Sequence, residues 1–157
     1  VQQVDGNYLI FRTSWVYSLR RDNFVNKVLK WARENEMLRI VDDQIANPTS
    51  ARMLAEATSL MLARGISFLC ERKGLYHLAG AGFVSRYEWA KEILALDPNP
   101  NEHVAREILS AKTSDFPMAA ERPHFSVLGC ERFRKTFDIA LPLWQNALFL
   151  AMGKKSI

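Results

Sequence analysis

The chain has 157 residues, of which 48% are hydrophobic and 24% are charged, and its formal net charge is +4. This length fits one domain with a sizeable core, and the ordinary glycine and proline contents exclude collagen-like and low-complexity classes. No apolar run reaches the roughly 18 residues that a membrane span needs, and the N-terminus lacks the features of a signal peptide. A chain that opens on Val1 and reaches a strand-like run by Tyr8 indicates a piece of a longer protein.

Strands and helices alternate along the sequence. Residues 8–17 (YLIFRTSWVY) are rich in aromatic and β-branched side chains, which predicts a buried strand. Asp22 or Asn23 is expected to cap a helix whose apolar residues recur at helical spacing. Residues 38–41 (LRIV) form the next predicted strand, and a polar segment follows it.

The middle of the chain continues this alternation. Because Pro48 disfavours helix at the residue before it, Thr49 or Ser50 is expected to cap a helix that runs to about Arg64. Residues 74–79 (GLYHLA) are a further strand candidate.

The last third begins with a clear helix signal. Ser85 and Glu88 form a capping box before a helix that stops at the turn cluster DPNP. We expect a strand at 108–111, a long polar loop over 114–128, a short helix at 131–135 and a last helix with Pro142 at its first position. The alternation predicts an α/β fold formed by residues 1–157 as one domain.

The positions of the cysteine, histidine and basic residues limit the classes of function that the chain can have. Cys70 and Cys130 are not in a Cys-x-x-Cys pair, as expected of reduced thiols in a cytoplasmic protein. The three histidines are scattered, so no metal site is expected; His77 is interpreted as an internal residue and His124 as solvated. The pI near 9.2 permits an anionic partner, but the dispersed basic residues argue against nucleic acid.

Two local patterns resemble motifs of cofactor-dependent enzymes. A dinucleotide needs a glycine-rich turn between a strand and a helix, and Gly74, Gly80 and Gly82 have the wrong spacing for it. Tyr87 and Lys91 match Tyr-x-x-x-Lys, an arrangement used for proton transfer to a carbonyl. This spacing is common by chance, and we interpret Tyr87 as a packing residue and Lys91 as solvated.

Six segments give the chain a family resemblance. In order they are LIFRTSWVY, RDNFVNKVLKWARE, DDQIANPTS, GLYHLAG with SRYEWAKEI, RPHFSVL and LPLWQNAL. Together they resemble the C-terminal, substrate-binding half of a dTDP-4-dehydrorhamnose reductase, an extended short-chain dehydrogenase/reductase, from Tyr8 to about Met152. The resemblance implies the C-terminal part of an NAD(P)-binding Rossmann-type fold with a small α/β substrate-binding region.

The resemblance also implies where the chemistry lies. The glycine-rich NADPH or NADH loop and the catalytic Ser/Thr, Tyr and Lys of the family lie upstream of its RTSW strand, so no catalytic residue is expected in this chain. Thr13 and Ser14 would lie beside the cofactor, and Trp15 against the sugar. A strand aromatic such as Trp15 is, taken alone, more often a core residue.

Further along the chain, two loops match the substrate-binding motifs of the family. Gln44 and Thr49 belong to the loop that would approach a dTDP-linked deoxysugar, although Gln44 by itself is compatible with ordinary surface. Arg122 and Ser126 belong to the Arg-Pro-x-x-Ser-x-Leu segment at the anionic end. A guanidinium fork suits a diphosphate independently of the resemblance.

Two positions depart from the family pattern. Ala46 stands where the family often has glycine, and Arg86 stands where it usually has an aromatic residue after serine. These departures bear on ligand affinity more than on the fold.

The leading hypothesis is that the parent protein reduces dTDP-4-dehydro-L-rhamnose to dTDP-L-rhamnose, with this chain supplying the substrate-binding region. The alternatives are another extended short-chain dehydrogenase such as a nucleotide-sugar epimerase or dehydratase, a non-catalytic nucleotide-binding regulator, and an unrelated α/β domain. The expected partners are the nucleotide-sugar and an N-terminal Rossmann half. An apolar seam around Leu9, Phe11 and Val16 would face that half and permit a homodimer.

Because the cofactor loop would lie outside this chain, we predict no reductase activity and no tight NADPH binding for the chain alone. The measurement is to mix the chain with NADPH and record cofactor fluorescence and oxidation. A clear micromolar cofactor signal would contradict the assignment of the cofactor site to another segment.

Overall fold

The computed structural model describes residues 6–117 and 119–153 and confirms the α/β class. The helices are α1 (Phe24–Glu34), α2 (Ala51–Leu62), α3 (Ile66–Cys70), α4 (Arg86–Ala95), α5 (Glu131–Phe137) and α6 (Trp144–Met152). The strands are β1 (Leu9–Arg12), β2 (Val16–Tyr17), β3 (Met37–Val41), β4 (Ile45–Ala46), β5 (Thr49–Ser50), β6 (Gly74–His77), β7 (Val84–Ser85) and β8 (Glu107–Ala111).

Two parallel strand pairs form the framework. β1 pairs with β6 from Leu9 opposite Gly74 to Arg12 opposite His77. β3 pairs with β8 from Met37 opposite Glu107 to Val41 opposite Ala111. Two shorter pairs, β2 with β5 and β4 with β7, connect the segments between them. Within the described residues each of these is a two-stranded sheet.

The strand predicted over residues 8–17 is broken in the structure. Thr13, Ser14 and Trp15 separate β1 from β2, and the two strands pair with different partners. Trp15 has φ +36°, a backbone conformation that is uncommon for a residue with a side chain. Its indole stacks on that of Trp89, with ring centroids 5.4 Å apart, so packing of this aromatic accompanies the break in the strand.

Two of the three helix caps predicted from the sequence are formed in the structure. Asn23 caps α1 by accepting a hydrogen bond from the N–H of Val25, and Ser85 caps α4 by accepting one from the N–H of Glu88. Ser50 precedes α2 but makes no side-chain cap bond.

Two helix boundaries differ from the prediction, and one short helix was not predicted. α2 ends at Leu62 rather than Arg64, and the short helix α3 follows it. α6 begins at Trp144 rather than Pro142, because the Pro142 carbonyl accepts a hydrogen bond from the Ala81 N–H instead of entering the helix.

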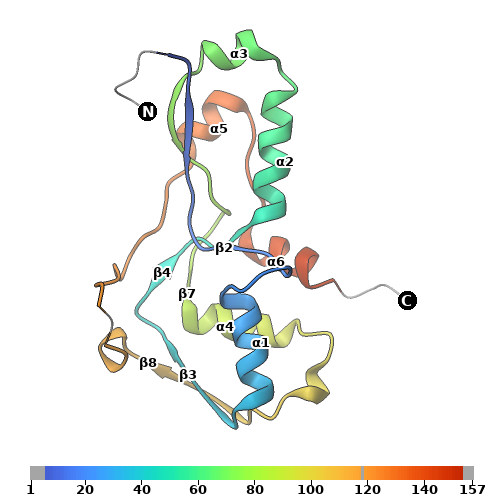
Figure 1. Ribbon diagram of the computed structural model, residues 1–157, viewed down its shortest axis with the longest axis vertical. Helices are drawn as coiled ribbons and strands as arrows, with labels where there is room; N and C mark the ends of the chain where they lie inside the picture. Colours follow the sequence, from blue (N-terminus) through green and yellow to red (C-terminus); the bar gives the residue numbers. More distant parts are fainter. Residues whose placement is uncertain (1–5, 118, 154–157) are drawn as a thin grey trace.

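The described residues form two apolar cores, one toward each end of the molecule (Figure 1). The first surrounds Trp89 and joins α1, α4, α6 and β3. The second contains Tyr76, Phe133 and Phe137 and lies among β6, α2, α3 and α5. Leu9 and Phe11 are partly buried against this second core, so the exposed apolar seam predicted around β1 is found only at Val16, which is 44% exposed.

A close backbone contact joins the loops between these cores. A Cβ at Gly80 would lie 2.3 Å from the Pro48 carbonyl oxygen, so only glycine fits there. The buried Asn47 side chain donates to the carbonyls of Gly80 and Gly82 and accepts from the N–H of Leu128 at 2.7 Å. Three distant segments are therefore fixed to one another by a single amide.

A buried carboxylate ties α4 to α1. Asp97, 4% exposed, accepts hydrogen bonds from Arg33 at 2.8 Å, His103 at 2.7 Å and the Asn99 N–H at 3.0 Å. Burial acts to raise the pKa of Asp97, but the hydrogen bonds and the charge of Arg33 outweigh it, and the pKa lies below its usual value. The ionised form of Asp97 is thus favoured in the folded protein.

Replacing this carboxylate should destabilise the fold. We predict that Asp97→Asn lowers the free energy of unfolding by about 2 kcal/mol at neutral pH, because Arg33 and His103 lose an ionised acceptor while Arg33 keeps its bond to the exposed Glu102. Since the folded pKa is depressed, this contribution is complete above the unfolded pKa of about 4 and is lost as pH falls through the folded value.

Urea unfolding at pH 7 and at pH 3 measures both effects. Glu34→Gln is the control, because among the described residues Glu34 makes only an exposed pair with Lys30 at 3.8 Å. Equal stability losses in the two variants, or a loss in Asp97→Asn that does not shrink at pH 3, would contradict the prediction.

Candidate functional site

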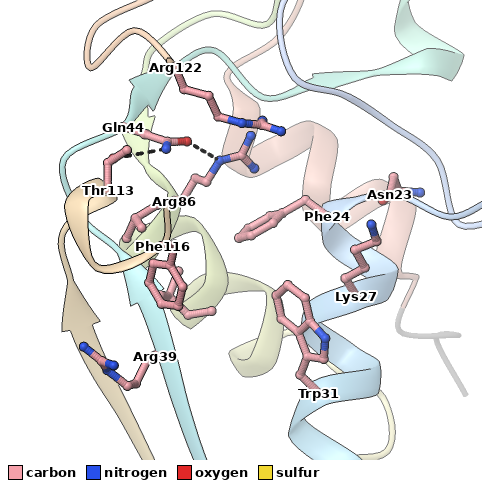
Figure 2. A pocket seen from close by; sticks show the side chains of 12 residues that line it. Asn23, Phe24, Lys27, Trp31, Arg39, Gln44, Arg86, Thr113, Phe116 and Arg122 are labelled. Atoms are coloured by element: carbon pink, nitrogen blue, oxygen red, sulfur yellow. Dashed lines mark hydrogen bonds between the residues drawn. The ribbon is translucent and has the colours of Figure 1, made fainter. Parts of the chain in front are cut away.

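A cavity of about 370 Å³ lies between α1, the end of β3, the start of α4 and the loop that follows β8 (Figure 2). Its volume is in the range of small-ligand pockets. The lining residues are Asn23, Phe24, Lys27, Trp31, Arg39, Ile40, Val41, Gln44, Arg86, Thr113, Phe116 and Arg122.

The charge in this cavity is all of one sign. Lys27, Arg39, Arg86 and Arg122 line it, and no carboxylate does so among the described residues. Lys27 pairs with Asp22 at 3.3 Å, and Arg39 pairs with Asp115 at 2.9 Å. Arg86 and Arg122 form no ion pair with any residue of 6–117 or 119–153, so the positive charge of this pair is uncompensated.

Arg86 is held by aromatic rings rather than by an acid. It is the first residue of α4, and its guanidinium carbon lies 4.3 Å from the Trp15 ring centroid and 4.8 Å from that of Phe24. Burial, and then the positive charge of Arg122, lower the pKa of Arg86 to about 10. The side chain is therefore still a cation at neutral pH, but its charged form is disfavoured by its surroundings.

Gln44 fixes the orientation of Arg86. The Arg86 Nε–H donates to Gln44 Oε1 at 3.0 Å, and Gln44 Nε2 donates to Thr113 Oγ1 at 3.1 Å (Figure 2). Because a guanidinium only donates, the amide oxygen must face Arg86. Gln44 is 7% exposed and lines the cavity, and both ends of its amide are used within the protein.

Asp43 anchors the other end of this chain of hydrogen bonds. Its carboxylate accepts from the Thr113 N–H at 3.0 Å and from the Thr113 hydroxyl at 2.7 Å, with the exposed His124 at 3.5 Å. Burial acts to raise the pKa of Asp43, but the two hydrogen bonds from Thr113 outweigh it and the pKa is lowered. The carboxylate thus holds the loop that carries Phe116 and Arg122.

The predicted residues of the RTSW segment lie at the carboxyl end of β1. Thr13 is exposed, Ser14 is half-buried, and neither lines the cavity. Trp15 meets the cavity only through its contact with Arg86.

Of the remaining predicted residues, Arg122 lines the cavity and Thr49 and Ser126 do not. Thr49 is fully buried, and its hydroxyl accepts from the Gly80 N–H at 3.1 Å and donates to the Asn47 carbonyl at 3.1 Å. The Ser126 N–H donates to the Ile45 carbonyl at 2.9 Å, which aligns the 122–128 segment with the Gln44 loop.

Some cavity-lining residues were not proposed from the sequence, although one sequence pattern could have indicated three of them. Phe24, Lys27 and Trp31 occupy one face of α1 at spacings of three and four, a basic residue between two aromatics. Arg39 and Phe116 had no such pattern, because strand and loop residues meet here only in the folded chain.

The two cofactor-like patterns are structural, as predicted. The Tyr87 hydroxyl points to the Ile108 carbonyl at 3.4 Å, and the exposed Lys91 pairs with Glu88 at 3.3 Å. A Cβ at Gly82 would meet the Trp144 ring at 3.2 Å, so this glycine, like Gly80, serves close packing.

Residues 6–117 and 119–153 contain neither a metal-binding cluster nor a membrane-spanning helix. No group of three His, Cys, Asp or Glu residues is arranged to hold a metal ion. No helix in this part of the chain has the length and apolar character to cross a membrane. Cys70 and Cys130 are free cysteines in this structure.

The fold is that of the extended short-chain dehydrogenase/reductase class. The UDP-N-acetylglucosamine 4-epimerase of Bacillus cereus superposes with a TM-score of 0.63 over 92% of this chain and 45% of its own, at only 12% identity. Within this class the chain belongs to the family described as the RmlD substrate binding domain, whose model matches residues 1–156.

Proteins similar to this chain include dTDP-4-dehydrorhamnose reductases. The dTDP-4-dehydrorhamnose reductase of Escherichia coli is 35% identical over 146 residues, which cover 92% of this chain and 48% of that protein. The structure of the Bacillus anthracis dTDP-4-dehydrorhamnose reductase in complex with NADP matches with a TM-score of 0.81 and 27% identity, over 96% of this chain and 50% of that one. The chain thus spans about half the length of the curated relatives it matches.

The residues described here do not form a cradle for the dinucleotide that this relative binds. Pro48 and Trp144 occupy the space beside the two glycines that follow β6, Gly80 and Gly82. The first residue of α4 is Arg86 rather than glycine. No backbone turn of the kind that receives a pyrophosphate is therefore present among them.

The cavity wall depends on Asp43, which gives a direct test. We predict that Asp43→Ala speeds hydrogen exchange of the Thr113 amide by about tenfold, because the amide loses a charged acceptor. Asp42→Ala is the matched control, since within the described part of the chain the Asp42 side chain bonds only to the exposed Lys112 at 2.8 Å. An equal increase in exchange in both variants would show that Asp43 does not anchor this loop.

Proposed function

We propose that this chain is the substrate-binding region of a reductase that converts dTDP-4-dehydro-L-rhamnose to dTDP-L-rhamnose with NADPH or NADH. One structural observation carries the proposal: a ligand-sized cavity that combines aromatic rings with two guanidinium groups that have no acidic partner among the described residues. A nucleoside diphosphate-sugar presents the matching chemistry, a stackable base and two adjacent phosphates. The names of the similar reductases support the choice of reaction.

The lining residues divide naturally between the two parts of such a ligand. Arg122, from the 122–128 segment, reaches the same end of the cavity as Arg86, while Trp31 and Arg39 lie at the other end (Figure 2). Arg122 would bind the diphosphate, and the rings of Phe24 and Trp31 would contact the apolar faces of the nucleoside or sugar.

The other predicted residues have indirect roles in this proposal. Trp15 would form the wall on the sugar side, behind Arg86. Gln44, Thr49 and Ser126 would shape the site by holding neighbouring groups in place, because their own hydrogen bonds are already made within the protein.

We further propose that the cofactor is bound by a Rossmann half that packs against β1 and β6. Parallel strands occur almost always in larger sheets covered on both faces, and within the described residues this pair has no third strand. Thr13 and Ser14 follow the carboxyl end of β1, the edge at which α/β sheets bind ligands, and would lie beside the nicotinamide.

Binding of dTDP to the chain tests the nucleotide site. We predict that Arg122→Gln weakens dTDP binding by about tenfold, because it removes a charge-assisted hydrogen bond, and leaves the weak binding of thymidine unchanged. Isothermal titration of both ligands measures this, with Arg64→Gln as a control that removes the same charge from the end of α2. Wild-type affinity of Arg122→Gln for dTDP would reject the assignment.

The reaction is tested on the full-length protein that contains this segment. NADPH oxidation, followed optically, is expected with dTDP-4-dehydrorhamnose and not with UDP-sugars. Isomerisation of a UDP-sugar without net NADPH oxidation, detected by chromatography of the sugar nucleotides, would favour an epimerase-like relative. An absence of any turnover would favour a nucleotide-binding regulator.

A further inference from the structure

Arg86 is in a place that ordinary packing rules disfavour. It occupies the first turn of α4, where the helix dipole is positive and an acidic residue would be favoured. It is packed on two aromatic rings, and a second cation, Arg122, lies close enough to lower its pKa. A neutral side chain would fill the same space without this repulsion, so packing alone does not account for an arginine here.

We propose that Arg86 is a second anion-binding residue, which acts with Arg122 as a two-guanidinium clamp on the diphosphate of the ligand. The inference rests on the proposed nucleotide-binding function and adds to it a residue at a position where the family pattern has an aromatic side chain. Arg86 thereby becomes a specificity-determining residue for ligands that carry two adjacent negative charges.

The donors of Arg86 are available for this role. Only its Nε–H is used, on Gln44 Oε1, and its two terminal nitrogens make no hydrogen bond to residues of the described part of the chain. Figure 2 shows the guanidinium groups of Arg86 and Arg122 at one end of the cavity, each coming from a different wall. A diphosphate has oxygens on both phosphorus atoms, so each fork can bind a separate phosphate.

The guanidinium is also preorganised. Contact with the rings of Trp15 and Phe24 fixes the position of its plane, and the bond to Gln44 fixes its rotation within that plane. Gln44 is oriented in turn by Thr113 and Asp43. Little conformational freedom remains to be lost when an anion binds, which favours affinity.

Titration with dTDP, inorganic pyrophosphate and thymidine tests the clamp. We expect Arg86→Met to weaken dTDP and pyrophosphate binding by tenfold or more, with thymidine binding unchanged. Pyrophosphate should raise the Tm of the wild type more than it raises the Tm of Arg86→Met at the same concentration. Arg64→Gln should behave as the wild type in every titration.

Gln44→Glu provides a second variant that keeps Arg86 and nearly the same shape. The new carboxylate would pair with Arg86 and compete with the ligand, so pyrophosphate and dTDP should again bind about tenfold more weakly. Circular dichroism confirms that both variants are folded. Wild-type pyrophosphate affinity in either folded variant would overturn the clamp.

The two proposals fail in different ways. Pyrophosphate binding that depends on Arg86, without binding of dTDP, would support the clamp and reject the nucleotide site. Binding of dTDP that depends on Arg122 but not on Arg86 would keep the nucleotide site and reject the clamp. Binding of neither anion by the wild type would reject both.

Discussion

The geometry of the site depends on one buried amide. Asn47 connects the β6–β7 loop, through Gly80 and Gly82, with the 122–128 segment, through Leu128. Gln44 lies three residues before this junction, Arg86 follows Gly82 by four residues, and Arg122 precedes Leu128 by six. Three side chains from remote parts of the sequence therefore reach one cavity because their loops are joined behind it. The lack of a side chain at Gly80 lets the backbones approach closely enough for this junction to form.

Local sequence patterns were sufficient for the parts of the fold that local forces determine. The cap residues Asn23 and Ser85, the strand at 108–111 and the helix at 131–135 were predicted, because capping, periodicity and β-branching act over a few residues. The strand over 8–17 was wrong, since the aromatic pattern does not reveal that Trp15 leaves the strand to stack on Trp89. The start of α6 was wrong for a similar reason, because a contact with Ala81 occupies Pro142.

The site was predictable only through the family resemblance, and then incompletely. Gln44 and Arg122 were proposed because they belong to short motifs, and both line the candidate cavity. Arg39 and Phe116 come from a strand and a loop without any motif, and only the pairing of β3 with β8 and the anchoring of the following loop bring them to the cavity. Arg86 was noticed as a departure from the family, but its burial beside Arg122 is a property of the folded chain.

The hydrogen-bonded series from Asp43 through Thr113 and Gln44 to Arg86 has a consequence for the electric field in the cavity. A carboxylate placed directly on Arg86 would orient it equally well but would cancel its charge. Here a hydroxyl and an amide, both neutral, stand between the acid and the guanidinium and act as an insulating spacer. The hydrogen bonds orient Arg86, while the negative charge stays on Asp43 at the far end of the series. The positive potential of the cavity is therefore preserved.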